Sequence, residues 1–303
     1  MTTADAEPTR CGFVAVIGAP NAGKSTLVNA LVGAKVSIVT PKAQTTRTLV
    51  RGIAMLGRAQ VIFIDTPGIF RPKQRFERAM VAAAWQGAAD AELTLFVLDA
   101  ARGLDGDSAA IVDNLVKSGR KAVLVLNKVD DADKPKLLDL AARLNQTGAF
   151  TEIFMVSALT GDGLDALKAR LAAAVPVGPW MFPPDDVSDM PNRLLAAEIT
   201  REKLFFNLHQ ELPYGCAVVT ERWEDRKDGS VRIDQLILIS RESHRPIVLG
   251  AGGRTLKKIG ASARAELQSL LDRTVHLFLH VKVDENWRSD RGLFSDWGLD
   301  YDA

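Results

Sequence analysis

The 303-residue sequence is poor in the residues that build metal clusters and disulfide frameworks, and its charges almost cancel. Its 2 cysteines, Cys11 and Cys216, are a lone and distant pair, which argues against a disulfide framework or a zinc site and is typical of a reducing compartment. None of the 4 histidines has metal-ligand spacing with cysteine or with paired carboxylates. The net charge of +1 excludes a general attraction to nucleic acid or membrane, so any such contact must come from a local patch.

Long hydrophobic runs are also missing from the sequence. No run of about 18 apolar residues could span a membrane, and residues 1–10 lack the apolar segment of a signal peptide. We therefore expect a cytoplasmic protein whose residues 1–10 are disordered. With 47% hydrophobic residues in a chain of 303, the composition predicts a soluble protein of two globular domains.

A glycine-rich segment lies between an apolar, β-branched stretch at 13–17 and a predicted helix that starts near Thr26. Glycines let the backbone wrap around phosphate oxygens, and the helix N-terminus adds the positive end of its dipole. In this pattern Lys24 reaches the β- and γ-phosphates, and the Ser25 hydroxyl ligates Mg²⁺. The segment predicts a nucleotide phosphate site formed by Gly18, Ala19, Pro20, Asn21, Ala22, Gly23, Lys24, Ser25 and Thr26.

The polar, proline-containing stretch 36–47 is predicted to be an exposed loop. Two threonines in it are within reach of a Mg²⁺ ion held by Ser25, and we prefer Thr46 over Thr45 as the ligand.

An acidic residue, Asp65, ends the buried strand predicted at 60–64, where ligands bind in open α/β sheets. We expect it to orient the same ion, so the predicted metal ligands are Ser25, Thr46 and Asp65. Gly68 offers an N–H and a flexible pivot that senses the γ-phosphate, which makes Lys24, Thr46 and Gly68 the predicted catalytic residues. The expected nucleotide site here comprises Asp65, Thr66, Pro67, Gly68 and Ile69.

Two more polar segments follow buried strands and fit a guanine base. The Asp130 carboxylate can accept hydrogen bonds from guanine N1–H and its exocyclic amine, whereas adenine would leave this charge unpaired. The backbone N–H of Ala158 is placed to meet the guanine carbonyl. The predicted base site consists of Asn127, Lys128 and Asp130, together with Ser157, Ala158 and Leu159.

Strands and helices alternate up to about residue 175, which predicts an α/β fold over residues 11–175: a P-loop GTPase domain with a doubly wound sheet and helices on both faces. Residues 176–191 are rich in proline and glycine and are predicted to be a semi-rigid linker. Residues 289–303 form a C-terminal tail.

Residues 192–288 show a different order: a helix at 192–211, two strands, a helix, a glycine turn, a helix and a final strand. A turn without side chains at its ends lets a sugar–phosphate backbone pack against it and against the next helix N-terminus. This order of elements resembles a type II KH domain, and the resemblance implies RNA binding by Gly250, Ala251, Gly252, Gly253, Arg254, Lys257 and Lys258.

The first half resembles the translation-factor-related GTPases, which carry five such nucleotide-binding elements. Ile69 stands where Ras-like members have a water-positioning glutamine, so we expect slow hydrolysis or another positioning group. Asn21 matches relatives that recruit K⁺ beside the phosphates, and we hypothesise that K⁺ supplies charge here.

The second half resembles a type II KH domain, an α+β RNA-binding fold, and the whole combination resembles the Era family of bacterial ribosome-assembly GTPases. The resemblance covers about residue 10 to Arg288, with Arg291 to Ala303 outside it, and Ala251 stands where the family usually has lysine. It implies a monomeric GTPase with Mg²⁺ as cofactor and GTP as substrate. The implied partner is the 3′ end of 16S rRNA in the small (30S) ribosomal subunit, with no DNA. The resemblance also implies peripheral association with the inner face of the cell membrane, although the sequence has no obvious anchor.

Three other interpretations stay open. The chain is alternatively a GTPase acting on another RNA, in tRNA modification or a different assembly step. It is also compatible with a binding module in which the nucleotide is only structural. A P-loop kinase is disfavoured, because such an enzyme has no use for the segment from Asn127 to Asp130.

Overall fold

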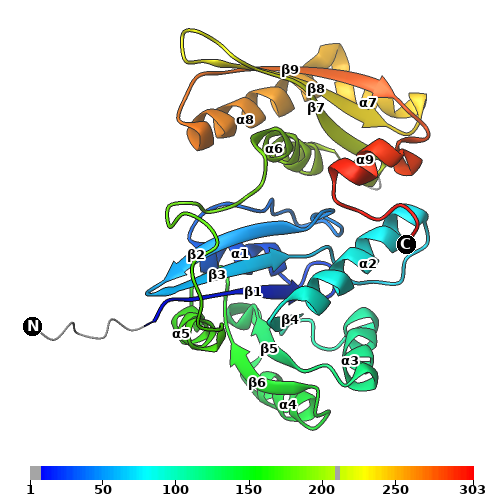
Figure 1. The fold of residues 1–303 in the computed structure, drawn as a ribbon. Coiled ribbons are helices and arrows are strands. Elements are labelled where there is room, and N and C mark those ends of the chain that lie inside the picture. Colours follow the sequence, from blue (N-terminus) through cyan, green and yellow to red (C-terminus); the bar gives the residue numbers. More distant parts are fainter. Residues whose placement is uncertain (1–7, 209–211) are drawn as a thin grey trace, which may run out of the picture. The chain divides into compact units, whose positions relative to one another are not determined.

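The structure is a computed structural model that describes residues 8–208 and 212–303. The chain forms two compact units, which we describe separately (Figure 1). The first contains the residues up to Asp189 together with Ser295–Ala303, and the second contains Met190–Phe294. Of the predicted disordered segment 1–10, residues 1–7 lie outside the described residues, whereas Arg10 already belongs to the first strand.

The first unit is built on a 6-stranded sheet with the strand order β2-β3-β1-β4-β5-β6. Strand β2 is antiparallel to β3, and the other neighbours are parallel, which is the mixed form of the predicted doubly wound sheet. The strands are β1 (Arg10–Ile17), β2 (Val50–Leu56), β3 (Ala59–Asp65), β4 (Leu93–Asp99), β5 (Ala122–Asn127) and β6 (Phe150–Met155).

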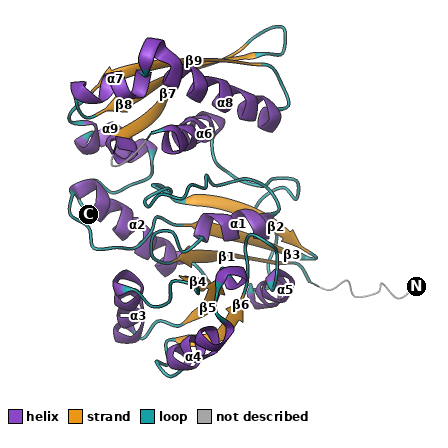
Figure 2. Cartoon of the chain, turned by 180° about the vertical axis from the view of Figure 1, so that it is seen from behind, coloured by secondary structure: helices purple, strands orange, loops and turns teal. Residues whose placement is uncertain are grey.

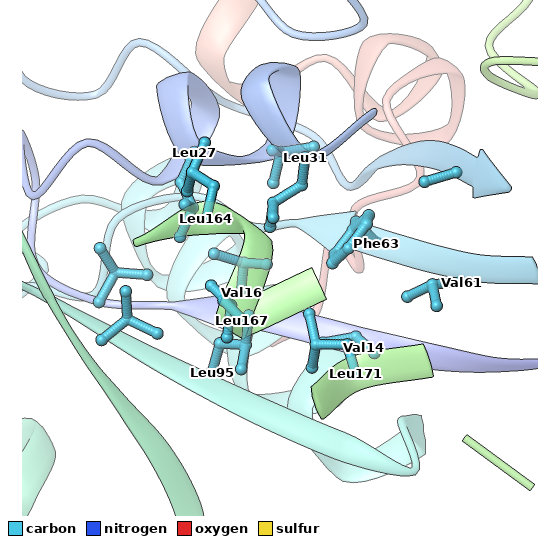
Figure 3. Close-up of a cluster of buried hydrophobic side chains, with 14 of the residues drawn as sticks. Val14, Val16, Leu27, Leu31, Val61, Phe63, Leu95, Leu164, Leu167 and Leu171 are labelled. Carbon is cyan, nitrogen blue, oxygen red and sulfur yellow. The ribbon is translucent and has the colours of Figure 1, made fainter. Parts of the chain in front are cut away.

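Helices cover both faces of this sheet because its buried strands are apolar on both sides. In β1, Val14 and Val16 face one core and Ala15 and Ile17 face the other. Figure 3 shows the first core, into which α1 and α5 insert leucines. The other face is covered by α2, α3 and α4. The helices are α1 (Lys24–Val32), α2 (Arg75–Asp90), α3 (Gly106–Ser118), α4 (Lys134–Asn145) and α5 (Leu164–Ala174), with a short 3₁₀ turn, η1 (Val129–Asp131).

The segment predicted as a linker instead runs along the edge of the first unit as far as Asp189. The buried amide of Gln60 accepts the backbone N–H groups of Met181 (2.8 Å) and Phe182 (3.0 Å) and donates to the Phe182 carbonyl (2.8 Å). Further along, the Ile53 N–H donates to the Val187 carbonyl at 2.9 Å. Long-range backbone pairing therefore holds much of this proline-rich segment on the first unit, and its predicted role as a linker over 176–191 stays a prediction.

The second unit has the order of elements predicted for a type II KH domain (Figure 2). Its 3-stranded sheet has the order β7-β8-β9, with β7 antiparallel and β9 parallel to β8. Helices α6 and α8 and the short α7 pack on this sheet through an apolar core that includes Leu204, Ile237 and Ile259. The predicted first helix ended at 211, but α6 ends at Asn207 and residues 209–211 lie outside the described residues. The elements are α6 (Asn192–Asn207), η2 (Leu212–Gly215), β7 (Cys216–Asp225), β8 (Val231–Ile239), η3 (Glu242–His244), α7 (Arg245–Leu249), η4 (Ala251–Gly253), α8 (Arg254–Leu271), β9 (Val275–Val283) and η5 (Trp287–Ser289).

A last helix, α9 (Arg291–Asp296), begins in the second unit and ends in the first. Residues 295–303 then pack on the first unit, where Trp297 is 7% exposed. In the described part of the chain, no helix combines the length and the apolar character needed to cross a bilayer.

Candidate functional site: a phosphate loop, an oxygen-lined metal position and a KH turn

The predicted phosphate loop joins the end of β1 to the start of α1. Two of its glycines are required by close approach. A Cβ at Gly18 would lie 2.3 Å from the Val97 carbonyl oxygen, and one at Gly23, whose φ is +90°, would lie 2.3 Å from the Asn127 amide nitrogen. The loop can therefore bring its N–H groups together only with glycine at these positions.

Lys24 lies inside this loop and is buried. Its ammonium donates to the carbonyls of Gly18 (3.1 Å) and Ala19 (3.0 Å). Burial lowers the pKa of Lys24 to about 8, against the opposing attraction of Asp65. A bound polyphosphate would favour the charged form of this buried group, as its predicted role requires.

Ser25, Thr46 and Asp65 come from three separate segments and meet at one point. The Ser25 hydroxyl donates to Asp65 Oδ2 at 2.7 Å and lies 2.8 Å from Thr46 Oγ1, which is 3.3 Å from the same carboxylate oxygen. Thr45 instead bonds Thr40 (2.7 Å) and the Lys42 carbonyl (2.8 Å), which agrees with the preference for Thr46.

The chemistry of this cluster fits Mg²⁺, which prefers oxygen ligands. Asp65 is fully buried, and burial raises the pKa of its carboxyl despite the hydrogen bonds that it accepts. Its Oδ1 is buried and makes no hydrogen bond of 3.5 Å or less to the described residues, although the buried Ser37 hydroxyl is near enough to lower the pKa of this carboxyl. A buried carboxylate oxygen left over beside two hydroxyls is what a divalent cation, or a water bound to it, would satisfy.

The segment after Asp65 packs against the phosphate loop. The Thr66 hydroxyl donates to the Val16 carbonyl (2.8 Å), and the Ile69 N–H donates to the Gly18 carbonyl (3.0 Å). A Cβ at Gly68 would lie 2.9 Å from a ring carbon of Pro20, so this position needs glycine. Ile69 is 7% exposed and belongs to the core, as expected for a side chain that cannot orient water.

Asn127 connects the phosphate loop to the predicted base site. Its buried side-chain amide donates to the Ala22 carbonyl and accepts from the Ala158 N–H, both at 3.0 Å. The Ala158 N–H, expected to face the guanine carbonyl, thus has Asn127 as its partner here. The predicted role of the Ala158 N–H toward the guanine carbonyl stays a prediction.

Lys128 and Asp130 differ in their surroundings. Lys128 has a φ of +64° and donates to the Asn21 carbonyl (2.9 Å) and to Asp99 (2.6 Å). Asp130 is exposed in η1, and its predicted role toward guanine stays a prediction. Asp99 is missing from the prediction. It lies at the carboxyl end of β4, just as Asp65 lies at the carboxyl end of β3, so the same signal could have found it.

The glycine turn of the second unit lies at the N-terminus of α8. Gly250, Gly252 and Gly253 all have positive φ, and a Cβ at Gly250 would lie 2.2 Å from the Thr255 hydroxyl. Space is open around Gly252 and Gly253, and Ala251 is exposed between them and Gly250. Arg254, Lys257 and Lys258 are exposed in the first turns of α8, so backbone N–H groups and positive charge face solvent together.

A cleft of about 770 Å³, which the sequence did not indicate, lies in the same unit as this turn. Its walls include Gly215, Ser240, Arg241, His244, Ile247 and Arg288. Burial, and then the positive charges of Arg241 and Arg288, hold the pKa of His244 below its usual range. Its Nδ1 is buried and has no hydrogen-bond partner among the described residues. The cleft joins segments that are far apart in sequence, so no local pattern could predict it.

Comparison with known proteins assigns both units. Residues 13–128 match the family of 50S ribosome-binding GTPases, and residues 211–288 match the KH domain family. GTPase Era of Rhizobium meliloti is 56% identical over 300 residues, covering 99% of this chain and 96% of the relative. GTPase Era of Caulobacter vibrioides is 53% identical over 309 residues, covering 97% and 98%. The chain belongs to the Era family of GTPases.

Two solved Era structures share the fold over nearly the whole chain. Each has a TM-score of 0.90, 38% identity, and coverage of 96% of this chain and 99% of its own. One is an Aquifex aeolicus Era variant bound to GDP and AlF₄⁻, and the other is Era in complex with MgGDPNP and nucleotides 1506–1542 of 16S ribosomal RNA. The predicted fold classes and the predicted Era resemblance are confirmed.

The extent of the resemblance needs one correction. We expected the resemblance to end before Arg291. The match to the Rhizobium relative covers 99% of the chain, so the residues outside the match are too few to include the whole segment from Arg291 to Ala303. At least part of the C-terminal segment is therefore aligned with this relative.

Proposed function

We propose that this Era-family GTPase is a GTP-gated RNA-binding protein that assists assembly of the small ribosomal subunit. It binds GTP with Mg²⁺ in its first unit and the 3′ end of 16S rRNA in its second. The observation that supports this most is the meeting of Ser25, Thr46 and Asp65 beside the phosphate loop, in a chain that also carries a KH turn.

In the nucleotide site, Lys24 and the loop N–H groups from Gly18 to Thr26 hold the phosphates. Ser25 and Thr46 are the proposed Mg²⁺ ligands with Asp65 behind them, and the ion would neutralise charge on the β- and γ-phosphates. Asp130 reads the guanine base, and Asn127 fixes the two loops on either side of it. Since Ile69 cannot position water, hydrolysis is slow, and a K⁺ ion beside the exposed Asn21 supplies additional charge.

In the KH unit, the turn from Gly250 to Gly253 and the N-terminus of α8 take the RNA backbone, with Arg254, Lys257 and Lys258 beside them. The adjoining cleft takes bases, because it has the size for them and its lining includes polar side chains such as Arg241 and Arg288. Recognition of single-stranded RNA by splayed-out bases is the usual mode of KH domains. The exposed basic residues of this unit also provide for peripheral contact with the inner face of the membrane.

Nucleotide state controls RNA binding through Thr46 and Gly68, whose segments are released when the γ-phosphate is lost. Binding of an RNA with the sequence of the 16S rRNA 3′ end should therefore be tighter with a GTP analogue than with GDP. Equal affinities would contradict the gating. Crosslinking that recovers tRNA or another RNA from cells would favour the alternative target.

The KH turn is tested by Gly253→Asp with Gly229→Asp as a matched control. Both glycines have left-handed backbone, with φ of +76° and +82°, and a Cβ at either would meet nothing within 4 Å. Backbone strain is thus similar in the two variants, while only Gly253 lies at the proposed phosphate contact. We expect RNA affinity to fall at least about tenfold in Gly253→Asp alone, because a carboxylate there repels the backbone. Equal losses in both variants would contradict the assignment.

A further inference from the structure

The C-terminal segment 295–303 is fastened to helix α2 of the GTPase unit by aromatic side chains. The rings of Trp297 and Phe76 pack edge to face with centroids 5.5 Å apart. The Arg75 guanidinium lies 4.5 Å from the centre of the Tyr301 ring. Leu299, between these two anchors, is 6% exposed, so the segment is seated and does not trail in solvent.

The contact on α2 lies next to two segments that the proposed function assigns to the nucleotide site. Helix α2 follows the turn from Asp65 to Gly68, in which the γ-phosphate is sensed. On the other side, the Arg47 guanidinium lies 5.7 Å from the centre of the same Phe76 ring, and Arg47 directly follows the proposed Mg²⁺ ligand Thr46. Phe76 is thus contacted by Trp297 of the C-terminal segment and by Arg47 of the loop that carries the proposed Mg²⁺ ligand Thr46.

The segment joins, through α9, residues that line the RNA cleft. Trp287 is fully buried, and its indole N–H lies 3.0 Å from the Ser240 hydroxyl and 3.3 Å from the Gly215 carbonyl, two residues of the cleft wall. Arg288, also in the wall, donates to the Tyr214 carbonyl at 2.8 Å. The chain therefore leads from the cleft wall at Arg288 to the contact of Trp297 with α2 within a few residues, and most of these residues belong to α9.

We propose that residues 295–303 are a nucleotide-responsive clasp, which docks on α2 when Thr46 is held in its ligand position and loosens when it is released. The clasp rests on the proposed function, in which the γ-phosphate holds Thr46. It gives the chain a second covalent route between nucleotide and RNA, independent of residues 176–191.

The direction of the proposed response takes the arrangement described here as the one that GTP favours. Here Thr46 lies within hydrogen-bonding distance of Ser25 and Asp65, Arg47 lies over Phe76, and Trp297 is seated. Docking thus accompanies the arrangement expected with GTP. Loss of the γ-phosphate frees Thr46, and Arg47 then leaves the ring that Trp297 packs against.

Amide hydrogen exchange of the full-length wild type tests the clasp without any substitution. With Mg²⁺ and a non-hydrolysable GTP analogue, the amides of 297–302 should exchange about tenfold more slowly than with GDP, the effect of one aromatic pair and one cation–π contact together. Equal rates, or slower exchange with GDP, would overturn the clasp. This measurement contains no RNA, so it is independent of whether RNA binding is gated.

A set of variants then tests what the clasp does. Trp297→Ala should bring the ratio of RNA affinities with analogue and with GDP to less than a third of its wild-type value, when both affinities are measured at saturating nucleotide. Trp297→Phe keeps a ring against Phe76 and should restore the ratio, and the exposed neighbour Asp296→Ala should not affect it. A wild-type ratio in Trp297→Ala overturns the clasp. A wild type without nucleotide-dependent RNA binding overturns the gating instead, and the exchange rates still decide the clasp.

Discussion

Replacing Asn127 by alanine should weaken the GTPase unit far more than the loss of one exposed amide would. Its side chain makes two buried hydrogen bonds of 3.0 Å, one to the Ala22 carbonyl in the phosphate loop and one from the Ala158 N–H. Alanine can replace neither bond, and water has little access because Asn127 is 1% exposed. Each group left unsatisfied costs about 1–3 kcal/mol, so the free energy of unfolding should fall by about 2–6 kcal/mol.

The same change should lower the affinity for GDP at least about tenfold, equivalent to about 1.4 kcal/mol, because two loops of the nucleotide site lose their common partner. Urea unfolding and titration with a fluorescent GDP measure the two quantities. Asn145→Ala is the matched control, since it removes the same amide from an exposed position on α4. If the free energy of unfolding of Asn127→Ala falls to within about 1 kcal/mol of that of Asn145→Ala, the reasoning that Asn127 bridges the two loops is refuted.

Three further predictions concern specificity, ions and pH. Asp130→Asn should make the protein prefer xanthosine triphosphate over guanosine triphosphate, because the amide no longer pairs with the two donors of guanine. Competition binding measures this preference, and an unchanged preference would contradict the predicted base site. GTP turnover should be faster in K⁺ than in Na⁺ buffer at equal ionic strength, and identical rates would remove K⁺ from the mechanism. Folding lowers the pKa of His244 below its ordinary value of 6.5. At a pH just below 6.5, the unfolded chain therefore binds a proton at His244 more readily than the folded chain does. Wild-type stability should therefore fall relative to His244→Asn as the pH drops from 7.5 to 5.5 in urea unfolding, and a constant difference would contradict the shift.

Local hydrophobic patterns could locate the segments that begin near Gly18, Asp65, Asn127 and Ser157, because each lies at or just beyond the carboxyl end of a buried strand. Ser25, Thr46 and Asp65 meet as predicted, since parallel strands end at one edge of the sheet. The partner of Asn127 was missed because residue type alone does not distinguish an amide that contacts a base from one that joins two loops.

Long-range features escaped prediction. The cleft around His244 and the docking of Trp297 join segments that only the tertiary fold brings together. Proline and glycine between 176 and 191 indicated a linker, but composition does not report that backbone N–H and carbonyl groups in this segment pair with Gln60 and Ile53.

That pairing determines how the protein can be divided. Strand β2 is the outermost strand of its sheet, and residues 187–188 shield part of its open side from other chains. A GTPase domain cut at 175 would expose this edge and strip the buried Gln60 amide of its three backbone partners, which invites aggregation. The first half of the chain should therefore be produced alone only if it extends to Asp189.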